Sequence, residues 1–154
     1  MIHFEPVDPQ HPDALALLHE AALEARTLYP ELFAPDAPLP TNAPAEPGSL
    51  YLLAREQGRA LACGALRPID AQTAELRRMF VTHDARRRGL ARAVLQQLEA
   101  AAPTLGYRRL RLETGYRQVP AMTLYQSCGW RPIEAFGSYV GDPTSRCFEK
   151  ILLP

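Results

Sequence analysis

Residues 81–92 read Val-Thr-His-Asp-Ala-Arg-Arg-Arg-Gly-Leu-Ala-Arg and form the most informative segment of the chain. An apolar run ending in Met79-Phe80-Val81 predicts a strand over residues 74–81, which a short polar turn and a helix near Gly89 follow. The first backbone N–H groups of a helix lack partners within the helix and carry partial positive charge. With three consecutive arginines and a glycine that admits close approach, the segment predicts an anion site suited to a pyrophosphate.

Two other phosphate-binding motifs do not occur in the sequence. The GxxxxGK[ST] pattern of P-loops is missing, and so is the GxGxxG pattern of dinucleotide-binding folds. The simpler interpretation of residues 86–92 is a solvated basic helix start, and charge alone favours it. The strand–turn–helix context favours the anion site.

Outward from this segment, hydrophobic periodicity predicts three helices. One begins at Asp13 and ends at Pro30, one covers residues 89–102, and Pro120 and Gly129 bracket a third. The order β-α-β-β-β-α-β-α-β-β indicates an α/β (α+β) fold with at least one parallel strand pair, linked by the helix at 89–102. The predicted strands cover residues 2–7, 49–55, 59–69, 74–81, 108–114, 131–134 and 147–152.

Residues 30–47 hold six prolines, which rule out a regular helix or central strand. A loop of this length usually has a function or is disordered. A domain linker is excluded, because the 29 residues before it are too few for a domain. The chain of 154 residues therefore predicts a single domain over residues 1–154.

Charge is divided unequally along the chain, although 17 basic and 17 acidic side chains cancel overall. Residues 1–50 carry eight acidic side chains and one basic one, whereas residues 51–154 carry nine and sixteen. This asymmetry indicates an anionic partner for the second part. The acidic first part is expected to attract a cationic amine, unless its carboxylates only face water.

Three cysteines without metal-ligand spacing predict a reduced, cytoplasmic protein, and four histidines form no metal constellation. No apolar run approaches the roughly 18 residues that span a membrane. The first residues show no signal-peptide pattern. We therefore expect no metal and no membrane association.

The chain resembles the GNAT superfamily of N-acetyltransferases. Residues 86–91 match that family's [RQ]-x-x-G-x-[GA] signature, and residues 121–130 match its A-[IM]-x-L-Y-x-x-x-G-[FWY] element. The resemblance implies a mixed, largely antiparallel sheet of about seven strands flanked by about four helices. It also implies acetyl-CoA as the acetyl donor, with the pantetheine arm on the end of strand 74–81 and the pyrophosphate on the segment after it. Cofactor contacts are thus implied for Met79, Phe80, Val81, Arg86, Arg87, Arg88, Gly89, Leu90, Ala91, Arg92 and Gln118.

One cofactor position departs from the family pattern. Many members have an asparagine before the last helix, whereas this chain has Gln118, which carries the same amide on a side chain one methylene longer.

Two residues are candidates for acid–base chemistry. Tyr125 matches the family tyrosine that protonates the leaving thiolate, although helical spacing alone makes it a core aromatic. Glu75 resembles in position the strand carboxylate that some members use as general base, and a salt bridge or a water chain is the alternative. Regular alternation predicts that Glu75, Arg77, Met79 and Val81 share one face of their strand.

The resemblance implies direct attack by a primary amine of a small molecule or peptide in a ternary complex. A covalent route through Cys128 is disfavoured, because no histidine lies near it in sequence. Phe33 and Tyr139 are candidates for the two walls of the acceptor site. A homodimer is expected only as a family tendency.

Two other functions are alternatives to catalysis. A non-catalytic module that binds CoA is the main alternative. A nucleic-acid binder fits poorly, because residues 1–50 are acidic and no stacking pattern accompanies the arginines.

Overall fold

The computed structural model describes residues 1–34 and 36–152, and it confirms the predicted order of strands and helices. The described residues form three α-helices, one fewer than the resemblance implies, and four single-turn 3-10 segments labelled η. In chain order the elements are β1 Ile2–Pro6, α1 Pro12–Leu28, η1 Pro30–Leu32, β2 Leu50–Glu56, β3 Arg59–Pro68, β4 Thr73–Val81, η2 His83–Ala85, α2 Leu90–Ala101, η3 Ala102–Leu105, β5 Arg109–Gly115, α3 Val119–Ser127, β6 Arg131–Ile133, η4 Gly137–Tyr139 and β7 Ser145–Ile151.

All seven strands belong to one sheet, in the order β1-β2-β3-β4-β5-β7-β6. Every neighbouring pair is antiparallel except β4 and β5, which run parallel. Parallel strands need a long crossover, and α2 supplies it. The predicted parallel pair and the largely antiparallel sheet are therefore confirmed.

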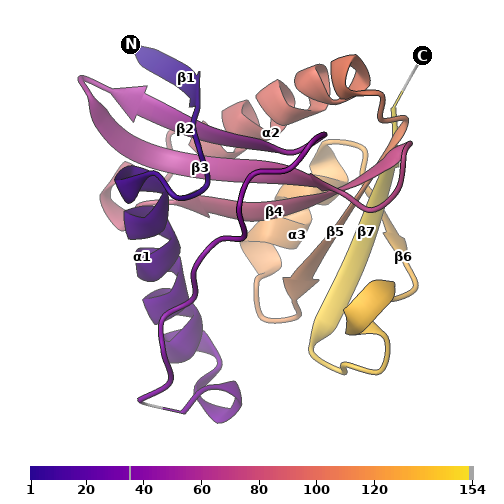
Figure 1. Ribbon diagram of the computed structural model, residues 1–154. Helices are drawn as coiled ribbons and strands as arrows, with labels where there is room; N and C mark the ends of the chain where they lie inside the picture. Colours follow the sequence, from indigo (N-terminus) through magenta and orange to yellow (C-terminus); the bar gives the residue numbers. More distant parts are fainter. Residues whose placement is uncertain (35, 153–154) are drawn as a thin grey trace.

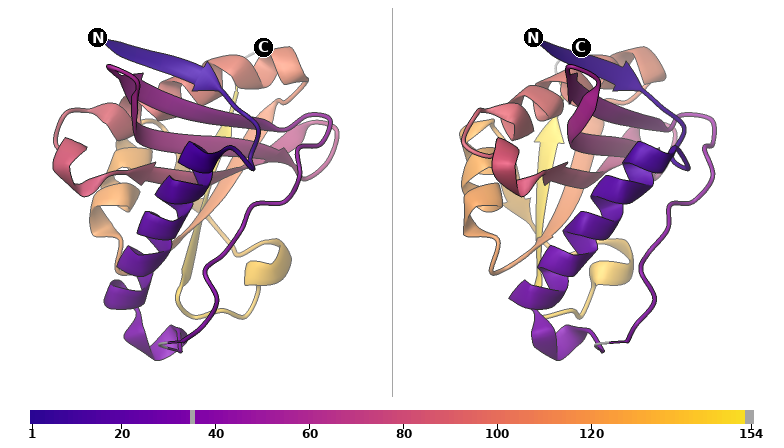
Figure 2. Two further views of the ribbon diagram at one scale, coloured as in Figure 1. Left: turned by 60° about the vertical axis from the view of Figure 1, so that its left-hand side comes forward. Right: turned by 90° about the vertical axis from the view of Figure 1, so that its left-hand side faces the viewer.

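The helices cover the two faces of the sheet unequally (Figures 1 and 2). α2 and α3 pack on one face, while α1 lies across the other. The larger core cluster lies under α2, whose buried stripe is Leu90, Val94, Leu95 and Leu98. A smaller cluster, including Leu17 of α1 and Leu53 of β2, lies on the α1 face.

The proline-rich segment runs beside α1 as an extended chain after the single turn of η1 (Figure 2). Arg26 Nη2 donates to the carbonyl oxygens of Ala37 and Pro38, at 2.7 and 2.9 Å. Asn42 is buried and donates to the Pro9 carbonyl oxygen at 2.9 Å. The segment is irregular as predicted, and Pro35, one of its six prolines, lies outside the described residues.

Candidate active site

β4 and β5 separate after only part of their length. Their pairing runs from Thr73–Arg109 to Leu76–Leu112, and residues 77–81 of β4 continue past it. Residues 113–115 of β5 pair only with β7. The β4 backbone therefore presents an unpaired edge toward β5, which a ligand can satisfy by hydrogen bonds.

A β-bulge in β4 lies at the same place. Cys63 of β3 faces Phe80, but Ala65 faces Arg77, so β4 has one extra residue opposite Gly64. Arg78 takes the left-handed conformation there, with φ of 61°. A Cβ on Gly64 would approach the Met79 sulfur to 2.6 Å, so β3 needs glycine at this position.

The bulge corrects one prediction. The sequence predicts that Glu75, Arg77, Met79 and Val81 share a face, but Met79 and Val81 pack against the core under α2. Phe80 instead packs with the cluster on the α1 face. The alternation prediction was wrong because a single extra residue reverses which face the following side chains take.

A cleft of about 510 Å³ separates α1 from β4 and β5, and we call it the α1 cleft. Its wall is mostly apolar, with leucines and alanines of α1 on one side and Phe80 on the other, and Met79 of β4 also borders it although its side chain packs under α2. Phe33, predicted as part of the acceptor wall, also lines it. The polar side chains in the lining are Arg26, Arg78, Glu113 and Gln118, with the hydroxyl-bearing Tyr51 and the thiol Cys63.

Glu113 is the carboxylate in this cleft. It lies on β5, one residue beyond the last β4–β5 pair. Burial raises the pKa of Glu113 above its ordinary value of 4.5, and the Ser145 hydroxyl, which donates to Oε2 at 2.6 Å, opposes that rise. A carboxylate with a raised pKa in a cleft is a candidate for proton transfer.

Gln118 precedes the first turn of α3 and lines the same cleft. Its side-chain oxygen accepts hydrogen bonds from the Thr114 hydroxyl at 2.5 Å and from the Gly115 backbone N–H at 3.0 Å. The oxygen is thus occupied, and the amide NH₂ group is what this side chain can offer to a ligand.

The turn between β4 and α2 contains two left-handed residues, Arg87 with φ of 64° and Gly89 with φ of 77°. Leu90 begins α2 and its side chain is buried, so only its backbone N–H can reach a ligand. Ala91 follows it in the first turn and is half-buried. Such a turn before a helix collects several outward N–H groups, which is the geometry of an anion site.

The arginines of this turn are not equivalent. Arg86 pairs with Glu24 of α1 at 2.5 Å, and Arg88 pairs with Glu56 of β2 at 2.7 Å. Arg87 is exposed and has no ion pair among the described residues. Arg92 donates to Ser127 Oγ at 3.0 Å and to Cys128 Sγ at 3.1 Å. Two of the three consecutive arginines therefore already hold carboxylates.

Tyr125 lies in the core beneath α3, on the face opposite α1. Its ring packs against Trp130 and Phe148, with centroid distances of 5.9 and 6.4 Å. Burial raises the pKa of Tyr125 above its ordinary value of 10.0, so the phenol stays neutral and keeps its donor proton.

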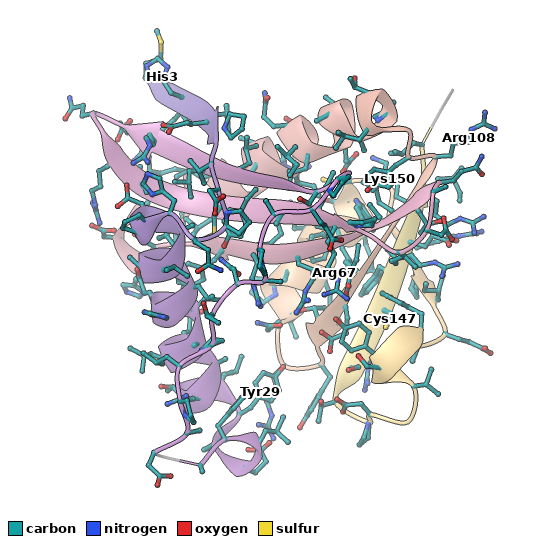
Figure 3. All side chains as sticks on the ribbon, in the orientation of Figure 1. His3, Tyr29, Arg67, Arg108, Cys147 and Lys150 are labelled. Carbon is teal, nitrogen blue, oxygen red and sulfur yellow. The ribbon has the colours of Figure 1, made fainter. Side chains whose placement is uncertain are left out.

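Glu75 and Tyr139 lie together, outside the α1 cleft. Tyr139 donates to Glu75 Oε2 at 2.5 Å, and Arg67 Nε lies 3.5 Å from Glu75 Oε1. Both residues line a second cleft of about 500 Å³ beside η4, which we call the η4 cleft. Figure 3 shows Arg67 between α1 and η4. The structure thus brings Phe33, Met79, Phe80 and Gln118 into one cleft and Glu75 and Tyr139 into another.

Sequence reasoning missed Glu113 and Arg78. Alternation on strand 108–114 places Glu113 on the polar face with Arg109 and Arg111. That pattern is the sequence evidence that could have pointed to Glu113. Its place in a cleft depends on where β4 and β5 part, and that cannot be read from local pattern. Arg78 faces the clefts because of the bulge.

Other reactive side chains do not form a second centre. Cys63 is buried, and burial raises the pKa of its thiol to about 12. Within residues 1–34 and 36–152, no three His, Cys, Asp or Glu side chains are grouped to hold a metal ion. Over the same residues, no helix combines the length and apolar character needed to cross a membrane.

Comparison with known proteins places this fold among acetyltransferases. A solved acyl-CoA N-acyltransferase structure from Klebsiella pneumoniae superposes with a TM-score of 0.81 at 30% identity, covering 99% of both chains. A GNAT family acetyltransferase from Elizabethkingia anophelis, solved with acetyl-CoA bound, has a TM-score of 0.68 at 18% identity over 98% of both chains and shares the fold.

The sequence comparisons give the family. The family model described as "Acetyltransferase (GNAT) family" matches residues 16–130. The IAA acetyltransferase of Azospirillum brasilense is 37% identical over 110 residues, which cover 70% of this chain and 71% of that protein. The chain therefore belongs to the acetyltransferase (GNAT) family, as the resemblance implied.

Proposed function

We propose that the protein is an acetyl-CoA-dependent N-acetyltransferase that acetylates a primary amine of a small molecule or peptide by direct attack. One observation carries this proposal. The α1 cleft, with Glu113 in its wall, opens where the unpaired edge of β4 passes toward the anion-binding turn before α2. Donor, acceptor and a proton-accepting group can therefore meet at one point.

The chain's own groups fit coenzyme A. The backbone N–H groups around Arg87, Gly89 and Leu90 would bind the pyrophosphate, with Arg87 and Arg92 adding charge. The β4 edge at residues 79–81 would pair with the amides of the pantetheine arm, and the Gln118 amide would donate to it. Arg86 and Arg88 contribute differently, because their ion pairs with Glu24 and Glu56 hold the turn in place.

The general base in this proposal is Glu113, acting directly or through a water. It removes a proton from the ammonium form of the acceptor, and the free amine attacks the thioester carbon. The carbon–sulfur bond then breaks, the acetyl group stays on nitrogen, and the proton lost by that nitrogen passes to sulfur. Glu75, the base named by the resemblance, has both oxygens engaged by Tyr139 and Arg67 in the η4 cleft.

The test is thiol release from acetyl-CoA with a panel of primary amines, using Glu113→Gln and Glu75→Gln as a matched pair. We expect Glu113→Gln to lower kcat by about 10²-fold or more, as for loss of a positioned base, and Glu75→Gln to lower it far less. Wild-type kcat falls as pH drops through the raised pKa of Glu113, which lies above 4.5, and Glu113→Gln loses that acid limb.

Two outcomes separate the alternatives. If CoA raises the melting temperature but no amine in the panel is acetylated, the protein is a CoA-binding module and the enzyme proposal fails. If Glu75→Gln instead removes the acid limb of kcat, the base is Glu75.

A further inference from the structure

Arg78 is a half-buried cation with no carboxylate partner. It projects from the β4 bulge and lines the α1 cleft together with a neighbouring cleft of about 520 Å³ beside residues 42–46, which we call the loop cleft. Its Nε donates to Asn42 Oδ1 at 2.9 Å. Across the described part of the chain, no acidic side chain lies within 4.0 Å of its guanidinium.

Arg77 adds a second cation at this place. It lines the loop cleft and the η4 cleft, and among the residues that the structure describes it has no side-chain hydrogen bond or ion pair. Burial, followed by the positive charge of Arg77, lowers the pKa of Arg78. An anion bound beside Arg78 would oppose both the effect of burial and the repulsion from Arg77.

None of the carboxylates that line the three clefts forms an ion pair with Arg78 among the described residues. Glu75 accepts from Tyr139 and lies near Arg67, and Glu113 accepts from Ser145. Asp8 at the rim of the loop cleft accepts from the Gln10 backbone N–H, and Glu46 at that rim is exposed. Arg78, whose guanidinium is a planar fork suited to a carboxylate, thus lines the cleft where the acceptor would bind without a carboxylate partner among the described residues.

We infer that the acceptor amine carries a carboxylate, which Arg78 binds with support from Arg77, while an apolar part of the acceptor lies against α1. This inference rests on the proposed N-acetyltransferase function and narrows its acceptor to amino-acid-like molecules. Leu17, Leu18 and Phe33 supply the apolar wall beside Arg78. This anion site is distinct from the proposed pyrophosphate site. Arg78 contacts Asn42 on the α1 face of the sheet, whereas the pyrophosphate would bind at the start of α2, which packs on the other face.

The experiment measures kcat/KM for matched acceptors that differ only in the carboxylate: L-leucine against L-leucinamide, and L-phenylalanine against L-phenylalaninamide. The wild-type enzyme is expected to prefer each acid by at least about tenfold. Arg78→Gln should raise KM for the acids by about 10- to 100-fold, the loss expected for a charged hydrogen bond, and change the carboxamides much less. Arg108→Gln is the matched control, since Arg108 is exposed just before β5 and points away from the clefts (Figure 3).

The outcomes are distinguishable. Acetylation of the carboxamides as fast as the acids overturns this inference but leaves the proposed function intact, and this comparison needs no variant. If no acceptor causes thiol release from acetyl-CoA, both the proposed function and this inference fail. If Arg78→Gln binds CoA more weakly than the wild type in calorimetry, Arg78 contacts the acetyl donor and not the acceptor, and the inference is overturned.

Discussion

The buried position of Tyr125 makes its phenol a weaker acid. An ordinary thiol has a pKa of about 8.5, well below the value of 10.0 for an unperturbed phenol, and burial raises the pKa of Tyr125 further. A phenol in this state gives up its proton to a thiolate only at a cost. We therefore propose that Tyr125, which matches the family tyrosine, would act on the leaving sulfur chiefly as a hydrogen-bond donor.

Tyr125→Phe tests this role while keeping the aromatic packing. The ring contacts with Trp130 and Phe148 do not involve the hydroxyl, so the melting temperature should change little. We expect kcat to fall by about 10²-fold, with the Kd for CoA unchanged. Full activity in this variant would mean that Tyr125 is only a core aromatic residue, as its helical spacing alone indicates.

Gly89 is a second residue whose conformation can be tested. Its φ of 77° is costly for other residues, but a Cβ built there meets no atom within 4 Å. Gly58, in the β2–β3 hairpin, has nearly the same φ of 80° and the same open surroundings. Gly89→Val and Gly58→Val should therefore lose similar stability, at least about 1–2 kcal/mol.

Only one of these two variants should affect the ligand. In Gly89→Val the shifted amides and the new side chain occupy the place proposed for the pyrophosphate, so CoA affinity should fall more than tenfold in calorimetry. Gly58→Val should bind CoA like the wild type. Equal CoA affinity in both variants would remove the pyrophosphate assignment.

At the scale of elements, local pattern was enough for the helices and strands. The stripe Leu90, Val94, Leu95 and Leu98 gives the α2 boundaries because its spacing matches one helical face. The separation of β4 from β5 and the bulge at Arg78 depend on pairing between strands distant in sequence. For that reason the segment proposed to bind the cofactor could be named from the sequence, while Glu113, Arg78 and the ion pairs of Arg86 and Arg88 could not.

Tyr29, just after α1, packs closely against Gly115 at the end of β5. The Tyr29 hydroxyl accepts from the Arg117 backbone N–H at 3.0 Å, and its ring lies against Gly115. A Cβ on Gly115 would overlap the Tyr29 hydroxyl and approach its ring carbon to 2.5 Å. The glycine is therefore needed for space and not for a special backbone angle.

Gly115→Ala should displace the Tyr29 ring and loosen the α1 wall of the acceptor cleft. The expected loss is about 1–3 kcal/mol, the usual cost of overpacking, which corresponds to a drop of several degrees in Tm. Adding Tyr29→Leu to the same chain should recover part of that loss in calorimetry. If Gly115→Ala is as stable as the wild type, the contact is not tight.

For the whole molecule, the opposite charges of the two halves meet in ion pairs. Four of the eight acidic side chains in residues 1–50 pair with arginines from residues 51–154: Glu5 and Asp13 with Arg55, Glu24 with Arg86, and Glu31 with Arg117. Each exposed pair contributes at most about 1 kcal/mol. Together they connect β1, α1 and η1 to the basic part of the chain, which leaves less free negative charge to attract a cationic amine.

Glu149 is a buried carboxylate of residues 51–154 that makes the stability of the fold depend on pH. It is buried on β7 and lies within 3.3 Å of Arg109 and Arg111 of β5 and Arg131 of β6. Burial alone would raise the pKa of Glu149, but hydrogen bonds from Arg131 and Arg111 outweigh it and lower the pKa below 4.5. Three neighbouring strands at one side of the sheet thus share a single carboxylate.

A lowered pKa in the folded state gives this carboxylate a pH-dependent contribution. The native state holds fewer protons than the unfolded chain between the two pKa values, so stability is complete above about 4.5 and declines as pH falls through the lowered pKa. Glu149→Gln should cost about 1.5–3 kcal/mol in urea unfolding at pH 7, the range for hydrogen bonds to a charged group. The curves of unfolding free energy for wild type and variant should converge as the pH falls through the lowered pKa of Glu149, because the wild type then loses the same charge. Curves that stay parallel over the whole acid range in which the protein remains folded would mean that the three arginines do not stabilise the ionised form of Glu149.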